Sequence, residues 1–581
     1  MNSIDKVKLF QNDRKNIIII IFIGLVIRFL AIDYGLPSTY NSTEYFIAKN
    51  ALSFGARQSL IPLNFIYPTF YTYLVTVIFA LYFLVGKLLS WFPTATDFAV
   101  HFLVDPSTFY LLGRSVSALL IICCAIILYK ICRFMLPPVL SLFISLGMFF
   151  SFNIFYFTLW MVPDGLLVCG TSVTLYFIVK NNHHILRFWE LLIGSVICGL
   201  TISTKYNAGF LAIGWIIAVS LTHGLDLSRR LGRIILALFF VMIGFFMGSP
   251  YWILAFSKFV TGFRMILTQA QYAYNIEAGL PYVWEMKEMV MSEWLLGLIF
   301  LSILIYMIYS LDRFTLPLIL VVFPTFIFVG WWEKKGLDYL LVIFPVLLVM
   351  LPYIFSKISG KRKAYIIFSV IILFALFLNI IRILYTDFLY RQKDTRQLTG
   401  IWIKENVPAG TAICYDHYHY DIDLIDFDRY IHYGEGSKYL NNPIKEKLIQ
   451  LQNTMPHYQF ISSQNQDSIP DIPDSLFQIA NSDSFLWRIY TNPRKSLSQI
   501  VSEGTEILIV NSYTYDKYLQ NEPPGPDNPL RYDFLRHQQF YEEIFSKLIP
   551  VITLEPAWNR PGPVIKIYNL QGISNECVNR N

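Results

Sequence analysis

Charged residues are scarce in this chain. Asp, Glu, Lys and Arg make up 15% of its 581 residues, whereas 55% are hydrophobic and 17% are aromatic. Soluble domains carry about 25% charged residues, so the composition excludes an ordinary soluble protein and indicates segments that face lipid. The net charge of +6 is small, and Lys and Arg lie mostly between the apolar runs. There they are typical of membrane orientation signals, and no nucleic-acid partner is expected.

Cysteine is scarce as well, with seven residues, and no Cys and His residues have the spacing of a zinc site. Five of the cysteines lie in or next to apolar runs, where packing is their expected role. Cys414 and Cys577 fall in a more polar region, and either a disulfide between them or two free thiols is compatible with the sequence. Two histidines and three aspartates between 416 and 423 lack metal-ligand spacing, so we expect a solvated loop. A divalent metal is allowed but not indicated.

The sequence also lacks internal repeats, coiled-coil heptads and a small-residue cleavage site after the first apolar run. We therefore expect residues 17–32 to form an uncleaved membrane anchor. Other apolar runs approach or exceed the ~20 residues that cross a bilayer as a helix. They predict spans at 110–128, 137–157, 164–180, 189–204, 206–222, 233–250, 293–310, 315–331, 338–355 and 364–385, which makes eleven with the first.

The basic residues between these runs indicate on which side of the membrane each connecting loop lies. With eleven spans, the later basic clusters fall on the same side as the basic N-terminal segment, which predicts a cytoplasmic N-terminus. These clusters are Lys130/Arg133, Lys180/Arg187, Arg229/Arg230/Arg233, Arg313 and Lys357/Lys361/Arg362/Lys363. Residues 67–92 are apolar enough to span, but a span there would move every later cluster outside. We therefore expect them to form a long juxtamembrane helix against the outer face.

The odd number of spans places the C-terminal region outside the cytoplasm. Residues 386–581 contain no run of membrane length and predict a mixed α/β domain in the periplasm, extracellular space or a lumen. We expect short strands at 411–415 and 507–511, and helices at 435–453 and 532–548. Residues 1–385 form the predicted transmembrane domain, with a first outer loop at 33–109.

Ionisable residues gather at the predicted outer interface, where charges close to lipid are functional or paired. Each has a structural alternative. Glu44 is a candidate base or a residue that tethers a helix starting near Ser42, and Asp164 is a site residue or a helix cap. Lys205 suits a phosphate or is a snorkelling lysine. Arg114 suits a phosphate or pairs with Glu44 or Asp164.

Several short motifs are similar to those of a known family. They are Asn-Ser-Thr-Glu at 41–44, Tyr-Pro at 67–68, Pro-Asp-Gly at 163–165, Ser-Thr-Lys-Tyr at 203–206 and Leu-Asp-Tyr at 337–339. They resemble the polyprenyl-phosphate-sugar-dependent membrane glycosyltransferases of the protein mannosyltransferase-like family 39. The resemblance implies a polytopic α-helical GT-C-like fold with about eleven transmembrane helices, an outer-face helix and a C-terminal soluble α/β domain. It also implies transfer of a monosaccharide from a polyprenyl phosphate to a hydroxyl of a protein, lipid or glycan.

The resemblance assigns roles to individual residues. Glu44 and Asp164 would be the catalytic carboxylates, with Asp33 at the end of the first span as the alternative acid. The residues expected to bind the donor phosphate are Lys205, Arg114, Tyr206 and Lys334.

Two positions depart from the family pattern. Thr43 stands where the family usually has Asp, and Asp338 stands where relatives often have Arg. A second hypothesis is therefore a degenerate relative that serves as a binding or assembly subunit with an envelope protein partner. A transporter is less favoured, because transporters bind at the midplane between repeated halves.

Overall fold

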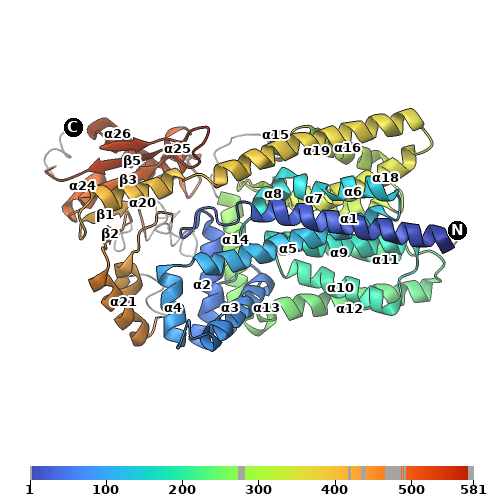
Figure 1. Cartoon of the computed structure of the whole chain (residues 1–581), viewed down its shortest axis with the longest axis horizontal. Helices are drawn as coiled ribbons and strands as arrows, with labels where there is room; N and C mark the ends of the chain where they lie inside the picture. Colours follow the sequence, from blue (N-terminus) through green and yellow to red (C-terminus); the bar gives the residue numbers. More distant parts are fainter. Residues whose placement is uncertain are drawn as a thin grey trace.

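The computed structural model describes residues 3–272, 282–416, 421–433, 440–464, 486, 489 and 492–572. Cys577, His417 and His419 lie outside the described residues, so the disulfide and loop predictions that involve them stay predictions. Helices make up most of the described chain, and a five-stranded sheet lies near its C-terminal end (Figure 1).

Long helices run side by side along the longest axis of the molecule and form its body, with the N-terminus at the end opposite the sheet (Figure 1). The longest are α1 (Ser3–Phe29), α5 (Ser107–Cys132), α9 (Asp164–His183), α12 (Leu227–Gly248) and α19 (Arg362–Tyr390). Shorter apolar helices of the body are α10 (Phe188–Ile202), α11 (Gly209–Ser220), α16 (Leu295–Tyr309), α17 (Thr315–Gly330) and α18 (Ile343–Ile358). Each of these helices falls on a span that the hydrophobic pattern predicts.

The segment 137–157, predicted as one span, forms three short helices. They are α6 (Pro138–Ser145), α7 (Gly147–Phe150) and α8 (Phe152–Phe157). Buried Glu293, the last residue of α15 (Val283–Glu293), accepts hydrogen bonds from the Ser151 hydroxyl (2.6 Å) and from the amides of Phe152 (3.0 Å) and Asn153 (2.8 Å). These amides begin α8 and have no partner within it. The Glu293 carboxylate, 140 positions away from Asn153, therefore stabilises the break between the helices. The hydrophobic pattern of residues 137–157 alone cannot predict a contact with so distant a residue.

Helices α10 and α12 touch backbone to backbone. A Cβ added at Gly199 would lie 2.0 Å from the carbonyl oxygen of Val241, and one at Gly244 would lie 2.2 Å from that of Val196. Small residues that allow such close approach are typical of helix pairs in membranes.

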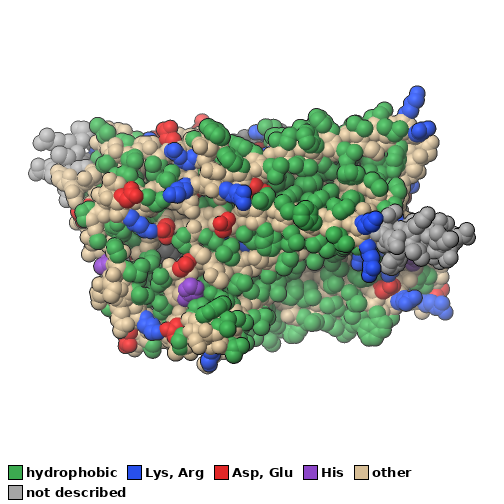
Figure 2. Space-filling model, in the orientation of Figure 1, with side chains coloured by type: hydrophobic (Ala, Val, Ile, Leu, Met, Phe, Trp, Pro, Cys, Tyr) green, Lys and Arg blue, Asp and Glu red, His purple; other side chains and the backbone are tan. Residues whose placement is uncertain are grey.

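An apolar surface surrounds the helical body. On α12, Ile235, Phe239 and Met242 are each more than half exposed, so one face of the helix has no protein partner in the described chain. Figure 2 shows that hydrophobic side chains cover the body, whereas Lys and Arg gather at the N-terminal end and mixed charges lie over the sheet. The helices Phe70–Leu88, Ser107–Cys132, Leu227–Gly248 and Arg362–Asn406 are long and apolar enough to cross a membrane. The chain is an integral membrane protein.

The first outer loop lies between the helical body and the sheet (Figure 1). Its helices are α2 (Ser42–Arg57), α3 (Phe70–Leu88) and α4 (Ala95–Val104). Residues 67–92 thus contain one long helix, and its position against the outer face of the membrane stays a prediction. Two later helices, α13 (Tyr251–Leu254) and α14 (Phe256–Tyr272), lie at the same end.

The sheet has the order β2-β1-β3-β5-β4. Its strands are β1 (Ala412–Tyr415), β2 (Gln459–Ile461), β3 (Ile507–Asn511), β4 (Ile552–Leu554) and β5 (Ile565–Asn569). β1 pairs in parallel with β2 and β3, and β5 pairs antiparallel with β3 and β4. On β3, Leu508 and Val510 pack in one core, while Ile507 and Ile509 pack in another. Both faces of the central strand are therefore covered, which explains its continuous apolar sequence.

Among the described residues of the C-terminal region, five α-helices accompany the sheet. They are α20 (Thr395–Asn406), α21 (Asn442–Thr454), α24 (Leu497–Ser502), α25 (Ser512–Leu519) and α26 (Arg531–Lys547). The predictions of strands at 411–415 and 507–511 and of a helix at 532–548 are confirmed within one residue. The helix predicted at 435–453 is α21, which starts at Asn442 because Asn441 caps it and Pro443 follows in its first turn.

The sheet region docks on the first outer loop. Apolar residues of α4 pack against Phe427, Ile444 and Leu448, and the Lys447 ammonium pairs with the Asp97 carboxylate. Nearby, the guanidinium of Arg396 lies 3.3 Å from the ring centre of Tyr40 and forms a double ion pair with Asp394. These contacts hold the sheet at one end of the helical body.

Candidate active site

Lys205 joins two carboxylates from distant segments. Its Nζ lies 2.9 Å from Asp164 Oδ1 and 2.9 Å from Asp338 Oδ2, and it also donates to the backbone carbonyl of Asp338 (3.2 Å). The Lys205 side chain is 7% exposed, that of Asp164 11% and that of Asp338 28%. An ammonium has three N–H groups, so these contacts use all of its donors.

Helix ends bring the three residues together. Asp164 is the first residue of α9, where free amides and the helix dipole favour a negative charge. Lys205 has extended backbone between the end of α10 and the 3₁₀ helix η1 (Tyr206–Ala208), so its side chain leaves the helical direction. Asp338 lies in a second 3₁₀ helix, η2 (Leu337–Leu340). Such breaks between apolar helices expose polar side chains close to the membrane surface.

Aromatic and basic residues line this cluster. The ring centre of Tyr339 lies 5.0 Å from Lys205 Nζ and 5.8 Å from Lys334 Nζ, within the range of cation–π contacts. Asn207 donates to the Tyr339 carbonyl. Burial lowers the pKa of the Lys334 ammonium. Together these groups form a polar, partly enclosed wall with aromatic faces.

Thr43 faces the same cluster through Tyr67. The Tyr67 side chain lies near that of Thr43 and within electrostatic range of Lys205, Asp164 and Asp338. The position where the family usually has Asp therefore borders the cluster, but it carries a hydroxyl.

Glu44 points to another part of the loop and is fully buried. Its oxygens accept from Arg114 Nε (2.8 Å) and Nη2 (2.7 Å), from the Thr39 hydroxyl (2.7 Å) and from the Met161 amide (2.6 Å). The remaining Arg114 nitrogen, Nη1, donates to the carbonyls of Ile32 (2.9 Å) and Tyr34 (2.8 Å). The pair ties the first outer loop to α5 and to the segment before α9. Of the alternatives that the sequence left for Arg114, the structure shows the pair with Glu44.

Two other candidates lie away from Lys205. The Asp33 side chain is on the exposed surface. Tyr206 packs edge-on against Phe263 (5.4 Å between ring centres) and near Phe259 of α14, and its hydroxyl donates to the Phe65 carbonyl (3.4 Å). Tyr206 therefore connects the cluster to α14.

The chain has only low similarity to known proteins. No family model and no curated protein matches the sequence. Among solved structures, ArnT from Cupriavidus metallidurans bound to undecaprenyl phosphate aligns over 95% of this chain and 97% of its own, with 12% identity and a TM-score of 0.48. An Archaeoglobus fulgidus oligosaccharyltransferase aligns over 87% and 70%, with 12% identity and a TM-score of 0.43. The S. cerevisiae protein O-mannosyltransferase Pmt1–Pmt2 complex bound to the sugar donor aligns over 42% and 34%, with 16% identity and a TM-score of 0.34.

Asp338 is the member of the cluster that sequence reasoning did not connect with the others. Its position was noted as a departure from the family, but no spacing relates residues 164, 205 and 338. Their proximity depends on the ends of α9 and α10 meeting η2. Among the described residues, no group of three or more His, Cys, Asp or Glu has the arrangement of a metal site.

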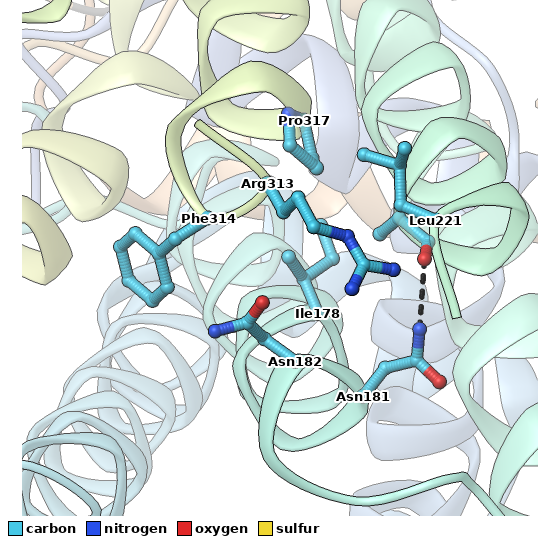
Figure 3. A pocket seen from close by; sticks show the side chains of 8 residues that line it. Ile178, Asn181, Asn182, Leu221, Arg313, Phe314 and Pro317 are labelled. Atoms are coloured by element: carbon cyan, nitrogen blue, oxygen red, sulfur yellow. Dashed lines mark hydrogen bonds between the residues drawn. The ribbon is translucent and has the colours of Figure 1, made fainter. Parts of the chain in front are cut away.

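A small pocket lies elsewhere in the helical body. Its lining residues are Ile178, Asn181, Asn182, Ala218, Leu221, Arg313, Phe314 and Pro317 (Figure 3). Its volume of about 10 Å³ matches a single water, and the Asn181 amide donates to the Ala218 carbonyl (2.7 Å) at its edge. Asn181 lies about 26 Å along α9 from Asp164 at 1.5 Å per residue, so this pocket is separate from the Lys205 cluster.

Proposed function

We propose that this protein is a membrane glycosyltransferase that moves a monosaccharide from a polyprenyl phosphate to a hydroxyl of a protein, lipid or glycan. The observation that carries the proposal is the buried Lys205 ammonium, held by Asp164 and Asp338 beside Tyr339 and Lys334. Two cations, two carboxylates and aromatic faces suit a sugar phosphate, because phosphate needs cations and sugars stack on aromatic rings. The sequence motifs around these residues support the same reaction.

The proposed topology has eleven spans with a cytoplasmic N-terminus. The transmembrane domain comprises residues 1–385, and residues 386–581 form a domain in the periplasm, extracellular space or a lumen. The first outer loop and the sheet lie at one end of the molecule (Figure 1), and basic side chains gather at the other (Figure 2). Next to Lys205, Tyr206 bonds to Phe65 of this loop, which supports the same orientation. In this topology α3 lies along the outer membrane surface.

In the proposed site, Lys205 and Lys334 bind the donor phosphate. Asp164 fixes the direction of the Lys205 side chain, and Tyr206 forms a wall below α14. Glu44 and Arg114 act as a structural anchor, because their polar atoms are already engaged with each other and with the loop. The acceptor would approach between the cluster and the sheet domain.

One observation favours a second function. Every donor of Lys205 is engaged by Asp164 and Asp338, so a phosphate must displace a carboxylate before it can bind. A degenerate family member that binds a partner in the envelope, without turnover, would keep such a closed cluster.

Turnover by the full chain in lipid nanodiscs separates the two functions. The donors would be undecaprenyl phosphate carrying mannose, glucose or galactose, with a cell-envelope extract as the source of acceptors, and the readout would be released undecaprenyl phosphate. We expect turnover by the wild type and a loss of roughly 100-fold or more in Lys205→Met. Lys87→Met, at an exposed lysine of α3, is the matched control and should keep full activity. Absence of wild-type turnover with every donor would contradict the proposal for those sugars.

A further inference from the structure

The two carboxylates that hold Lys205 differ in their surroundings. Asp164 lies at the start of α9 and is the more deeply buried of the two. Asp338 is 28% exposed, and it bonds to Lys205 through Oδ2. Its other oxygen, Oδ1, has no hydrogen-bond partner among the described residues. Asp338 is thus the more exposed carboxylate of the cluster, and its Oδ1 is free to accept a hydrogen bond.

The other acids of the outer interface are less suited to accept a proton. Glu44 is fully buried, and its oxygens accept four hydrogen bonds. Asp33 is on the surface and bonds to no residue of the Lys205 cluster. Thr43 carries a hydroxyl, which cannot act as a base at neutral pH. Tyr67 lies near Thr43 and within electrostatic range of Asp338.

Asp338 also occupies hydrogen-bond donors of Lys205 that a bound phosphate would use. Its carboxylate and its carbonyl take two of the three ammonium hydrogens, and Asp164 takes the third. An incoming phosphate therefore competes with Asp338, the more exposed partner, rather than with Asp164.

We propose that Asp338 is the general base of the transfer, and that the donor phosphate releases it by taking its place on Lys205. This inference rests on the proposed glycosyltransferase function. The released carboxylate remains in the cluster and accepts the proton of an acceptor hydroxyl that approaches C1 of the sugar from the side opposite the phosphate.

The step balances as an inverting displacement. The acceptor O–H gives its proton to Asp338 Oδ1, and the acceptor oxygen forms a bond to C1 of the sugar. The bond between C1 and the phosphate oxygen breaks, and its electron pair leaves with the polyprenyl phosphate. Lys205 stabilises the charge that develops on this leaving group.

Three variants of Asp338 test the proposal in the full chain in nanodiscs. Asp338→Asn keeps the side-chain size but cannot accept the proton, and Asp338→Ala leaves space for added formate. Asp338→Glu keeps the carboxylate but places it one methylene group farther from the backbone. Asp105→Asn, at an exposed carboxylate of the first outer loop, is the matched control. Each variant is measured for kcat with the three undecaprenyl-phosphate sugars and for the Kd of undecaprenyl phosphate alone.

We expect kcat of Asp338→Asn to fall by about 100-fold or more, which is the usual contribution of a general base. Its Kd for undecaprenyl phosphate should stay equal or decrease, because the competing carboxylate is gone. Formate should restore turnover to Asp338→Ala and leave wild type unchanged, and Asp338→Glu should retain part of the activity. A purely structural role would not produce rescue by formate.

The proposal is overturned if Asp338→Asn keeps kcat within about threefold of wild type, or if formate fails to restore Asp338→Ala. A weaker Kd in Asp338→Asn would also overturn it, because Asp338 would then support the phosphate site instead of competing for it. In each of these cases wild-type turnover leaves the proposed function standing. If wild type shows no turnover with the three donors, the proposed function fails for them and the inference fails with it.

Discussion

Two adjacent residues, Thr43 and Glu44, contact different parts of the structure from the first outer loop. They lie at the start of α2, where successive side chains point about 100° apart. Thr43 meets Tyr67 beside the Lys205 cluster, and Glu44 enters a buried pair with Arg114. Glu44 therefore anchors the first outer loop, and the neighbouring Thr43 borders the proposed site.

Glu44→Gln should destabilise the protein and leave the chemistry intact. The change leaves the Arg114 guanidinium buried beside a neutral amide, and breaking such a buried pair costs about 3–5 kcal/mol. We expect a lower unfolding midpoint in detergent, but an unchanged kcat per folded molecule. Glu405→Gln, at an exposed glutamate, is the control. A stable Glu44→Gln protein without turnover would show instead that Glu44 takes part in catalysis.

At the scale of residues, the sequence indicates which residues are candidates for the proposed site better than it indicates which of them pair with each other. Asp164 and Lys205 were candidates because they interrupt apolar runs at the outer interface, and the structure places them 2.9 Å apart. Asp338 could not be assigned as their partner, since no local pattern relates three distant helix ends. Arg114 could not be assigned either, because its choice between a phosphate and Glu44 depends on how the loop packs.

At the scale of elements, helix positions follow from hydrophobicity, but breaks and crossings do not. Apolar runs of suitable length predict where α5 and α9 begin and end within a few residues. The break at Ser151 depends on Glu293 from a distant helix. The contact between α10 and α12 depends on two glycines, each of which faces the backbone of the other helix. Such features arise from tertiary contacts, so a single segment carries no signal for them.

The α10–α12 crossing should tolerate no larger residue. In Gly199→Ala the new Cβ would lie 2.0 Å from a backbone oxygen of α12, so the helices must separate, at a cost of about 3 kcal/mol or more. Gly232→Ala, on α12 with open space around it, should be neutral or slightly stabilising, since alanine favours a helix. Thermal unfolding of both variants in the same detergent checks this. Equal midpoints for the two variants would contradict the close contact.

The sheet region should lose stability in mild acid through His537. Burial lowers the pKa of this imidazole, which stacks on Tyr518 with 4.4 Å between ring centres. A base with a lowered folded-state pKa favours folding fully above its unfolded value near 6.5, and this contribution is lost as the pH falls below that value. We expect the midpoint of wild type to drop between about pH 7 and 5, and the drop to be smaller in His537→Gln. Parallel pH curves for the two proteins would contradict a role for His537.

At the scale of the whole molecule, the first outer loop and the sheet share one end of the helical body (Figure 1), while Lys and Arg gather at the other (Figure 2). The proposed site contacts this loop through Tyr206 and Phe65. This polarity suits an enzyme whose donor stays in the membrane and whose acceptor arrives from outside. The sheet would then limit which acceptors reach Lys205.

Reporter fusions test this orientation in bacteria. Alkaline phosphatase joined after Gln392, just beyond α19, should be active, whereas the same reporter joined after Lys361, before α19, should be inactive. The reverse result would be expected with a fluorescent protein that matures only in the cytoplasm. Phosphatase activity at both positions would contradict a span at 364–385.

The docking of α21 on α4 also affects the order in which the chain can fold during synthesis. Asp97 and Lys447 meet across 350 positions of the chain, and at about 5–20 residues per second a ribosome needs roughly 20–70 s to make that length. During this interval the apolar side chains of α4 that later meet α21 have no partner from the sheet region. The first outer loop therefore lacks this partner, and is open to lipid or to a chaperone, until about three quarters of the protein has been synthesised.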